Sequence, residues 1–309
     1  CCTPCSIRGS VISDVQTLPN LTPRSHFFSA LLDFFSKQPL GAAGGLAILI
    51  MFLAALFAEW VAPYSPTQID FLARLVPPSP EHVMGTDGFG RDIFSRVIYG
   101  ARTAMTVGFV AAIVGTSLGA IVGVFSAFMG GWVDLAIQRL IDVLLSFPII
   151  VMALIVVAII PRSEMFGVDV NVIVAIAIPF ILKVARVIRS AALTVVTMPY
   201  IDATRAAGFS KARIMFRHIM PNVVAPYLIM LTALLGQAIL LEASLSFLGL
   251  GVSEPTPAWG LMLSGTNADY YREAWWVIVF PGLAISMTVF GFNLFGDSLR
   301  DWLDPRLKA

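Results

Sequence analysis

The chain is poor in charged residues. Only 20 of its 309 residues are Lys or Arg and 19 are Asp or Glu, which together make 13% of the sequence, whereas about a quarter of the residues in a typical soluble domain are charged. This shortage excludes an ordinary soluble enzyme, a nucleic-acid-binding protein and a disordered chain, because each needs more charge facing water or phosphate. Hydrophobic residues make up 58% of the sequence, and the mean hydropathy is +0.85. The composition therefore predicts an integral membrane protein.

Cysteine and histidine are too few and too scattered to indicate a metal centre or a disulfide framework. The cysteines are Cys1, Cys2 and Cys5, and the three histidines lie in separate segments. A chain that begins with Cys could be a cleaved lipoprotein, but the flanking charges favour a cytoplasmic location for this end, so a trimmed start is the simpler interpretation. No lysine follows the glycine pattern of a P-loop. We therefore expect no metal, no cofactor and no catalytic site in this chain.

Long uncharged windows are the main feature that is present. A helix that crosses the hydrocarbon core needs about 20 residues with almost no charge. Six windows meet this requirement, although the fourth is short and is completed only if Lys183 and Arg186 extend their side chains to the interface. We predict an all-α integral membrane fold with six transmembrane helices, at about residues 38–60, 103–129, 140–161, 169–187, 222–250 and 274–296.

The segments between these windows indicate the orientation of the chain. Because the number of spans is even, both termini lie on one side of the membrane. If that side is the cytoplasm, fourteen of the 20 Lys and Arg residues lie inside, as the positive-inside rule requires. We therefore expect a cytoplasmic segment 1–37, a transmembrane domain 38–300 with a periplasmic loop 61–102 and a cytoplasmic loop 188–222, and a cytoplasmic tail 301–309.

Two local patterns predict how helices begin and pack. Asp92 is expected to cap a short helix in loop 61–102 before the chain enters the membrane. Gly115, Gly119 and Gly123 recur every four residues in the second span and so share one helix face. Such a face lets membrane helices approach closely. The neighbour could belong to this chain or to a partner.

A few acidic residues interrupt the apolar pattern. Asp134, Arg139 and Asp142 lie where the third span begins, and their spacing suits local ion pairing at the inner boundary. Glu242 lies in the fifth span near its outer end. It could contact a substrate amine or close an outer gate, but a structural hydrogen bond to a backbone N–H or to a hydroxyl on a neighbouring span is the favoured interpretation.

Loop 188–222 has the signals of two short helices rather than of a flexible linker. Pro199 suits the first turn of a helix, Gly208 can end that helix in the left-handed conformation, and Ser210 can cap a second helix. The first helix has little side-chain bulk at Ala203 and the alanines that follow it. A rigid elbow of this kind can seat in a groove of another protein, with charged residues such as Asp202 at its rim.

The second helix of this loop is amphipathic. Its predicted apolar face leaves Arg213 and Arg217 stacked one turn apart, and Pro221 is expected to mark the turn into the fifth span. Composition alone favours an alternative in which the helix lies among lipid headgroups with its arginines on anionic lipid. The residues of the predicted apolar face are Met215, Phe216, Ile219 and Met220.

This loop resembles the cytoplasmic signature loop of bacterial ABC-importer permeases, which runs Glu-Ala-Ala, three residues, Gly, nine residues, Ile-x-Leu-Pro. The matching residues are Asp202, Ala203, Thr204, Gly208 and, thirteen positions later, Pro221. Asp and Thr replace the motif's Glu and second Ala, and the motif's Ile and Leu are replaced by His and Met. Asp keeps the charge of Glu but has a shorter reach.

Four further stretches are similar to the dipeptide, oligopeptide and nickel permease family, specifically to its second permease subunit, which is dipeptide permease C-like. With the loop they extend the likeness from about Leu40 to the C-terminus. The four stretches are 85–108, 130–148, 241–262 and 291–308.

The resemblance implies the type I ABC importer fold in the bacterial inner membrane, with this chain as half of a translocation pathway for di- or oligopeptides. It implies as partners a homologous second permease, two cytoplasmic ATPases that bind ATP-Mg, and a periplasmic or lipid-anchored solute-binding protein. Nickel, glutathione or another non-peptide solute is the alternative cargo. An ion-coupled secondary transporter is less favoured, because the windows leave no acidic group deep in a span. The implied ATPase-coupling residues are Asp202, Ala203, Thr204, Arg205, Gly208, Arg213, Arg217 and Pro221.

Overall fold

The structure is a computed structural model that describes residues 38–165, 168–265, 270 and 272–303. The predicted cytoplasmic segment 1–37, with its three cysteines, and most of the tail 301–309 lie outside the described residues. The chain divides after Lys37 by its internal contacts. The fold described below is that of the part that begins at Gln38.

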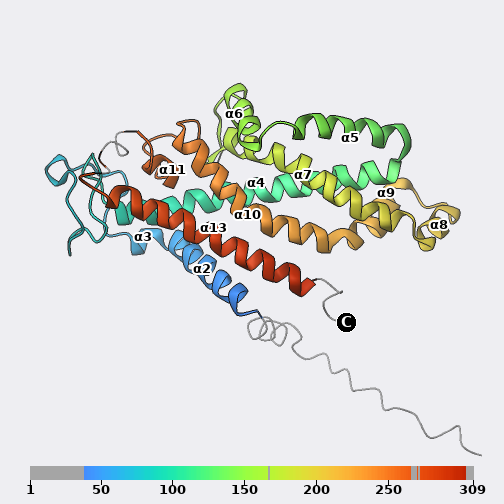
Figure 1. The fold of residues 1–309 in the computed structure, drawn as a ribbon, viewed down its shortest axis with the longest axis horizontal. Helices are drawn as coiled ribbons and strands as arrows, with labels where there is room; N and C mark the ends of the chain where they lie inside the picture. Colours follow the sequence, from blue (N-terminus) through green and yellow to red (C-terminus); the bar gives the residue numbers. More distant parts are fainter. Residues whose placement is uncertain (1–37, 166–167, 266–269, 271, 304–309) are drawn as a thin grey trace, which may run out of the picture. The chain divides into compact units, whose positions relative to one another are not determined.

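Helices make up most of this part (Figure 1). Its two strands are two residues long each and pair antiparallel. The elements are, in chain order, α2 (Pro39–Leu56), α3 (Ala58–Val61), η1 (Phe71–Ala73), α4 (Ile93–Met129), α5 (Gly131–Leu145), α6 (Ile149–Ile159), β1 (Glu164–Met165), β2 (Val168–Asp169), α7 (Val170–Val196), α8 (Pro199–Ala206), α9 (Lys211–Ile214), η2 (Met215–Ile219), η3 (Met220–Val223), α10 (Val224–Phe247), α11 (Trp259–Met262) and α13 (Trp276–Leu303).

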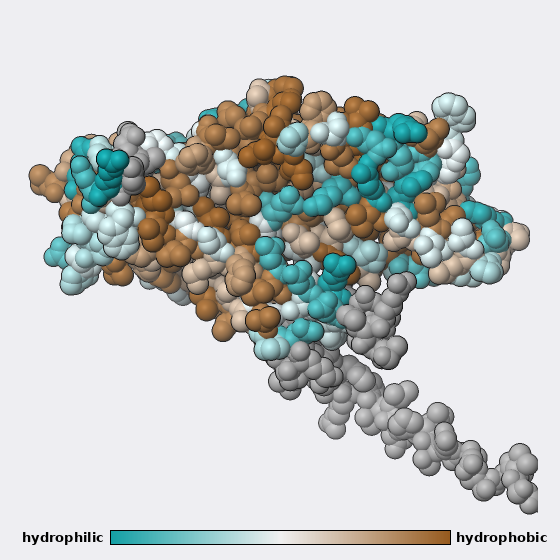
Figure 2. Space-filling view, viewed as in Figure 1, coloured by the Kyte–Doolittle hydropathy of each residue, from teal (hydrophilic) through white to brown (hydrophobic). Residues whose placement is uncertain are grey.

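The prediction of an all-helical membrane fold is confirmed. Within the described residues, five helical segments are long and apolar enough to cross a membrane, and a sixth is present if α5 and α6 together form one span. Hydrophobic residues cover much of the face shown in Figure 2, and hydrophilic residues gather over α5 and toward the ends of the long helices. Helices α8 and α9 lie at one end of these helices, and α3 and α11 lie toward the other (Figure 1).

The centre of the fold is the contact between α4 and α7. An added Cβ atom at Gly115 would lie 2.8 Å from the Cβ of Phe180, and one at Gly119 would lie 2.8 Å from the carbonyl oxygen of Ile181. At Gly123 it would lie 2.6 Å from the carbonyl oxygen of Ala185. The predicted glycine face is therefore a packing surface, and its neighbour is α7 of the same chain.

The predicted third span differs from the structure. Instead of one continuous helix over 140–161, the chain forms α5 and α6, which meet at an angle of 95°. Pro148 precedes α6 in an extended conformation, with φ −54° and ψ 136°. Proline lacks an amide hydrogen and biases the residue before it away from the helical conformation, which explains the break after Ser146.

Three other helices extend beyond the predicted spans. α4 begins at Ile93, because Asp92 accepts a hydrogen bond from the amide of Ser95 at 2.8 Å and no breaker follows. The short outer helix and the second span are thus one helix. α7 continues to Val196, so the first nine residues of the predicted loop 188–222 are helical. α13 reaches Leu303, inside the predicted tail.

Loop 61–102 is connected to the loop that precedes α11 by charged side chains. Arg91 donates to Asp87 at 2.7 Å and to Glu254 at 2.9 Å, and Glu254 lies 3.6 Å from Arg96. Arg91 and Arg96 are buried. Because a buried guanidinium group is costly without a counter-charge, these ion pairs hold the two loops together.

Candidate functional site

The structure contains the predicted elbow, which consists of α8, α9 and the turn at Gly208 between them. Pro199 lies in the first turn of α8, and Gly208 has φ +75°, the left-handed conformation that favours glycine. The Ser210 hydroxyl accepts a hydrogen bond from the amide of Arg213 at 3.3 Å and caps α9. These three local predictions are confirmed.

Buried isoleucines connect the elbow to the helical core. Ile201 of α8, Ile214 of α9 and Ile219 of η2 are almost fully buried and belong to the main hydrophobic cluster. Burial of each such side chain contributes roughly 2 kcal/mol. Polar contacts add to this, because the Asn222 amide donates to the Tyr200 hydroxyl at 3.1 Å and joins α8 to the start of the fifth span. The elbow is therefore packed against the helices that it joins.

The outer surface of the elbow is exposed. Asp202, Ala203 and Gly208 are exposed, and Thr204 is half-buried with its hydroxyl donating to the Ile201 carbonyl at 2.7 Å. Arg205 is ion-paired with Asp202 at 3.1 Å. An exposed pair of this kind contributes little to stability, so both charges remain accessible to another protein.

Aromatic rings orient the two arginines of the elbow. The Arg205 guanidinium lies 5.5 Å from the ring centre of Phe128, near the end of α4, and Arg213 lies 4.4 Å from the ring centre of Phe209. Such cation–π contacts restrict a long side chain without removing its charge. The elbow thus presents two positioned cations beside small residues.

The connection to the fifth span differs from the prediction. Pro221 does not mark a turn, because one helical run extends from Lys211 to Phe247 and contains a turn of π-helix in η2. The predicted apolar face is only partly correct. Ile219 is buried and Met215 and Met220 are half-buried, but Phe216 is exposed, since a π-turn shifts the register of the side chains. Arg217 is also exposed.

Glu242 is fully buried in α10. Its Oε1 accepts a hydrogen bond from the Ser246 hydroxyl at 2.8 Å, and its Oε2 has no partner among the described residues. Ser246 also accepts from the amide of Val252 at 3.3 Å. The partner hydroxyl is thus on the same helix, not on a neighbouring span. This burial favours the structural interpretation of Glu242 over the gate.

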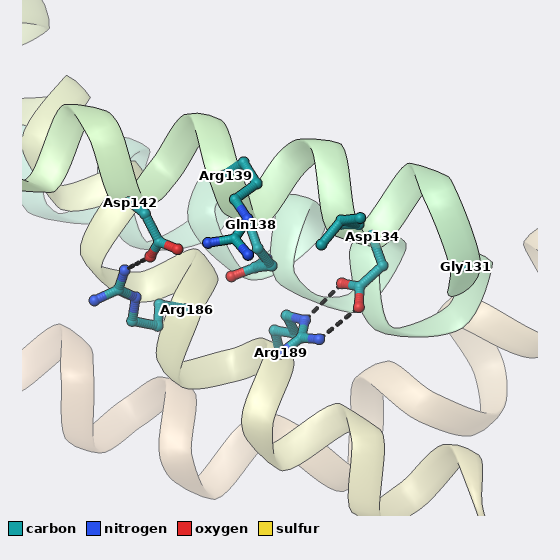
Figure 3. Close-up of a pocket in the computed structure, with 8 residues that line it drawn as sticks. Gly131, Asp134, Gln138, Arg139, Asp142, Arg186 and Arg189 are labelled. Atoms are coloured by element: carbon teal, nitrogen blue, oxygen red, sulfur yellow. Dashed lines mark hydrogen bonds and ion pairs between the residues drawn. The ribbon is translucent and has the colours of Figure 1, made fainter.

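A charged cavity lies between α5 and α7 (Figure 3). Arg189 donates from two nitrogens to both carboxylate oxygens of Asp134, and Arg186 is paired with Asp142. The prediction of local pairing along one helix is therefore wrong, because the partners of both aspartates are on α7. The volume of this cavity is about 690 Å³, and Arg139 lines it without an ion pair among the described residues.

One pair of polar residues was not predicted. Lys183 was expected to extend to the interface, but its ammonium donates to the side-chain carbonyl of Gln237 on α10 at 3.1 Å. No local sequence pattern indicates this contact, because 54 residues separate the two. Within the described part of the chain, no group of three or more potential metal ligands occurs.

This arrangement is that of a multi-pass membrane protein in which an exposed helical elbow is built into the spans. The chain belongs to the family described as the inner membrane component of binding-protein-dependent transport systems, whose model matches residues 115–309. Residues 29–78 match the model of the N-terminal transmembrane domain of oligopeptide transport permease C. The family is the membrane permease of ABC importers.

Relatives and a solved structure agree with this assignment. The chain is 40% identical over 305 residues to the di/tripeptide transport system permease protein DppC of Pseudomonas aeruginosa, covering 95% of this chain and 98% of the relative. It is 39% identical over 276 residues to the glutathione transport system permease protein GsiD of Pectobacterium atrosepticum, covering 89% and 90%. The MetNI methionine ABC transporter in an inward-facing conformation matches with a TM-score of 0.53 and 17% identity, over 69% of this chain and 98% of that chain. This last likeness supports the fold.

Proposed function

We propose that this chain forms half of the translocation pathway for di- or oligopeptides, and that segment 199–221 couples it to a cytoplasmic ATPase. The peptide substrate is supported by the likeness to a permease named for di- and tripeptides. The partners are a homologous permease, two ATPases that bind ATP-Mg and a periplasmic or lipid-anchored solute-binding protein. The chain itself contributes the pathway and the coupling contact.

The observation that carries the coupling proposal is the continuity of the elbow with a span. Ile201 and Ile214 hold α8 and α9 against the core, and the helical run from Lys211 to Phe247 leads from the elbow through the membrane. The exposed small residues around Ala203 leave room for another protein's surface to approach closely. A push on the elbow is therefore transmitted to the span and not absorbed by a flexible loop.

The topology that follows is part of the proposal. We infer that both termini and segment 199–221 are cytoplasmic and that loop 61–102 is periplasmic, because this orientation keeps most Lys and Arg inside. The transmembrane domain is 38–300, with α5 and α6 together as its third span. The location is the bacterial inner membrane, as the family's description indicates. Gly208, Arg213, Arg217 and Pro221 belong to the coupling segment with Asp202, Ala203, Thr204 and Arg205.

The test uses the complete transporter in proteoliposomes, with labelled dipeptide and the binding protein outside and ATP inside. Uptake is expected only when ATP and both ATPases are present. Ala203→Trp is expected to reduce co-purification of the ATPases and uptake by about tenfold, as loss of a central interface contact does. Ala136→Trp, on an exposed position of α5, is the matched control.

Three outcomes would change the proposal. Uptake driven by an ion gradient without ATPases would overturn ATP coupling in favour of a secondary transporter. Normal ATPase binding by the Ala203→Trp variant would show that the elbow is not the contact. Uptake of glutathione or a nickel chelate with no dipeptide uptake would leave the coupling intact and reassign the solute.

A further inference from the structure

Lys183 lies at the middle of a membrane-spanning helix. It is 13 residues from each end of α7, which places it about 20 Å of helix rise from either end. Gln237, which accepts its hydrogen bond, lies 13 residues from the start of α10. The Lys183 ammonium group donates to Gln237 of α10 at 3.1 Å instead of extending along α7. The ammonium group therefore lies between two helical segments that are each long and apolar enough to cross a membrane.

The face that carries this pair is not buried within the chain. Lys183 and Gln237 are both half-buried, whereas their neighbours Val184 and Ala238 are completely buried. If this face met lipid, the ammonium would stand in hydrocarbon, which costs several kcal/mol. The face therefore meets water or polar groups of a solute or another protein.

The positive charge of Lys183 has no counter-charge in the described residues. The next two cations along α7, Arg186 and Arg189, are neutralised by aspartates of α5. Glu242 on α10 is buried and hydrogen-bonded to Ser246. Lys183 has only the neutral amide of Gln237 as a partner, so two of its three N–H donors are free for an anion.

We propose that Lys183 and Gln237 form a carboxylate-binding site for the solute inside the translocation pathway. Lys183 supplies the positive charge. The side-chain oxygen of Gln237 accepts from Lys183, which orients the amide so that its nitrogen supplies a second donor. The ligand is the carboxylate of an amino acid or peptide. A peptide has a carboxylate that must be stabilised in a region otherwise lined by apolar spans. This inference rests on the proposed transport function and adds a residue that selects for a free carboxylate.

The first experiment measures dipeptide uptake per ATP hydrolysed by the complete transporter. Lys183→Met is expected to reduce this ratio about tenfold, which corresponds to one charged hydrogen bond, while ATPase activity stimulated by the binding protein is retained. Lys183→Arg, which keeps the cation, is the matched control. Gln237→Glu keeps the size of both side chains and gives Lys183 a fixed counter-charge, so it is expected to fold and to lower the ratio similarly.

The second experiment tests whether water reaches the site. In a variant with Cys1, Cys2 and Cys5 replaced by Ser, Lys183→Cys is expected to react with a water-soluble anionic thiol reagent, and dipeptide is expected to slow this reaction. Leu49→Cys is the control, because Leu49 is an exposed apolar residue in the middle of α2. It is expected to remain unlabelled.

If the wild type takes up dipeptide and the ratio of uptake to ATP hydrolysis is unchanged in Lys183→Met and Gln237→Glu, this inference would be overturned. The proposed transport function would stand. Absence of dipeptide uptake by the wild type would instead overturn the proposed function. Loss of the second permease on purification of Lys183→Met would mean that a partner's carboxylate, not the solute, pairs with Lys183. No labelling of Lys183→Cys would exclude an aqueous pathway at this face.

Discussion

Asp134 of α5 and Arg189 of α7, which are 55 residues apart in sequence, form an ion pair through both carboxylate oxygens. The pair is mostly shielded from solvent, with side-chain exposure of 14% for Asp134 and 28% for Arg189. The Ser126 hydroxyl near the end of α4 also donates to Asp134. Residues of three helices therefore meet at one carboxylate.

Removal of either partner of this pair is expected to destabilise the protein. Asp134→Asn or Arg189→Met should each lower the free energy of unfolding by about 1–3 kcal/mol, because one partly buried charge is left without its partner. The measurement is thermal unfolding of the purified complex. The double variant should lose less than the sum of the two single variants. Asp202→Asn, which breaks an exposed pair, is the control and should change stability by less than about 0.5 kcal/mol. If the losses of the two single variants simply added up in the double variant, the interaction between Asp134 and Arg189 would be contradicted.

Gly119 is expected to tolerate no side chain. Gly119→Ala should destabilise the fold by about 1–3 kcal/mol, because the new methyl group would lie 2.8 Å from a carbonyl oxygen of α7 in a tightly packed contact. Gly282→Ala in α13 is the matched control, because no atom lies within 4 Å of its added Cβ. There alanine should be neutral or stabilising by up to about 1 kcal/mol. Equal melting temperatures for the two variants would show that α4 and α7 are not so close.

Gly208 is expected to be required because of its backbone conformation and not because space around it is limited. Nothing lies within 4 Å of a Cβ atom added there, but φ is +75°. Gly208→Val should therefore distort the elbow at a cost of about 1–2 kcal/mol and lower uptake per ATP hydrolysed, whereas Gly208→Asn, which accepts this conformation more readily, should behave nearly as the wild type. If both variants coupled equally well, the left-handed turn would be irrelevant to coupling.

Glu242→Gln is expected to leave transport unchanged. The amide oxygen can accept from Ser246 as the carboxylate does, and the change removes a potential charge from a fully buried position. Glu242→Leu should be less stable, because the Ser246 hydroxyl loses this partner. The readouts are uptake and the melting temperature. A strong uptake defect in Glu242→Gln at normal stability would support the gate interpretation instead.

Features that depend on local chemistry could be predicted from the sequence. The caps at Asp92 and Ser210 and the left-handed Gly208 follow from the preferences of single residues, and the Gly119 face follows from the helical period. The spans were predictable because a backbone in hydrocarbon must be helical and uncharged side chains must surround it. These rules need no knowledge of distant contacts.

Features that depend on distant partners could not be predicted. The spacing of Asp134 and Asp142 suggests pairing along one helix, but the arginines that neutralise them are on α7. Lys183 was expected at the interface because the fourth window is short, and no rule based on sequence neighbours can identify Gln237 as its partner. The third span was predicted as one continuous helix over 140–161, and the 95° angle between α5 and α6 was not foreseen because it depends on how α6 packs. Pro221 was expected to mark a turn, but the helix continues past it because of the π-turn in η2.

The uninterrupted helix from Lys211 to Phe247 has a mechanical consequence. Its 37 residues make a rod about 55 Å long, with the arginine-bearing tip at one end and Gln237 part of the way along it. If such a rod rocks by about 5° around its midpoint, each end swings by about 2 Å. A displacement of that size at the arginine-bearing tip is enough to break or form a hydrogen bond at the far end.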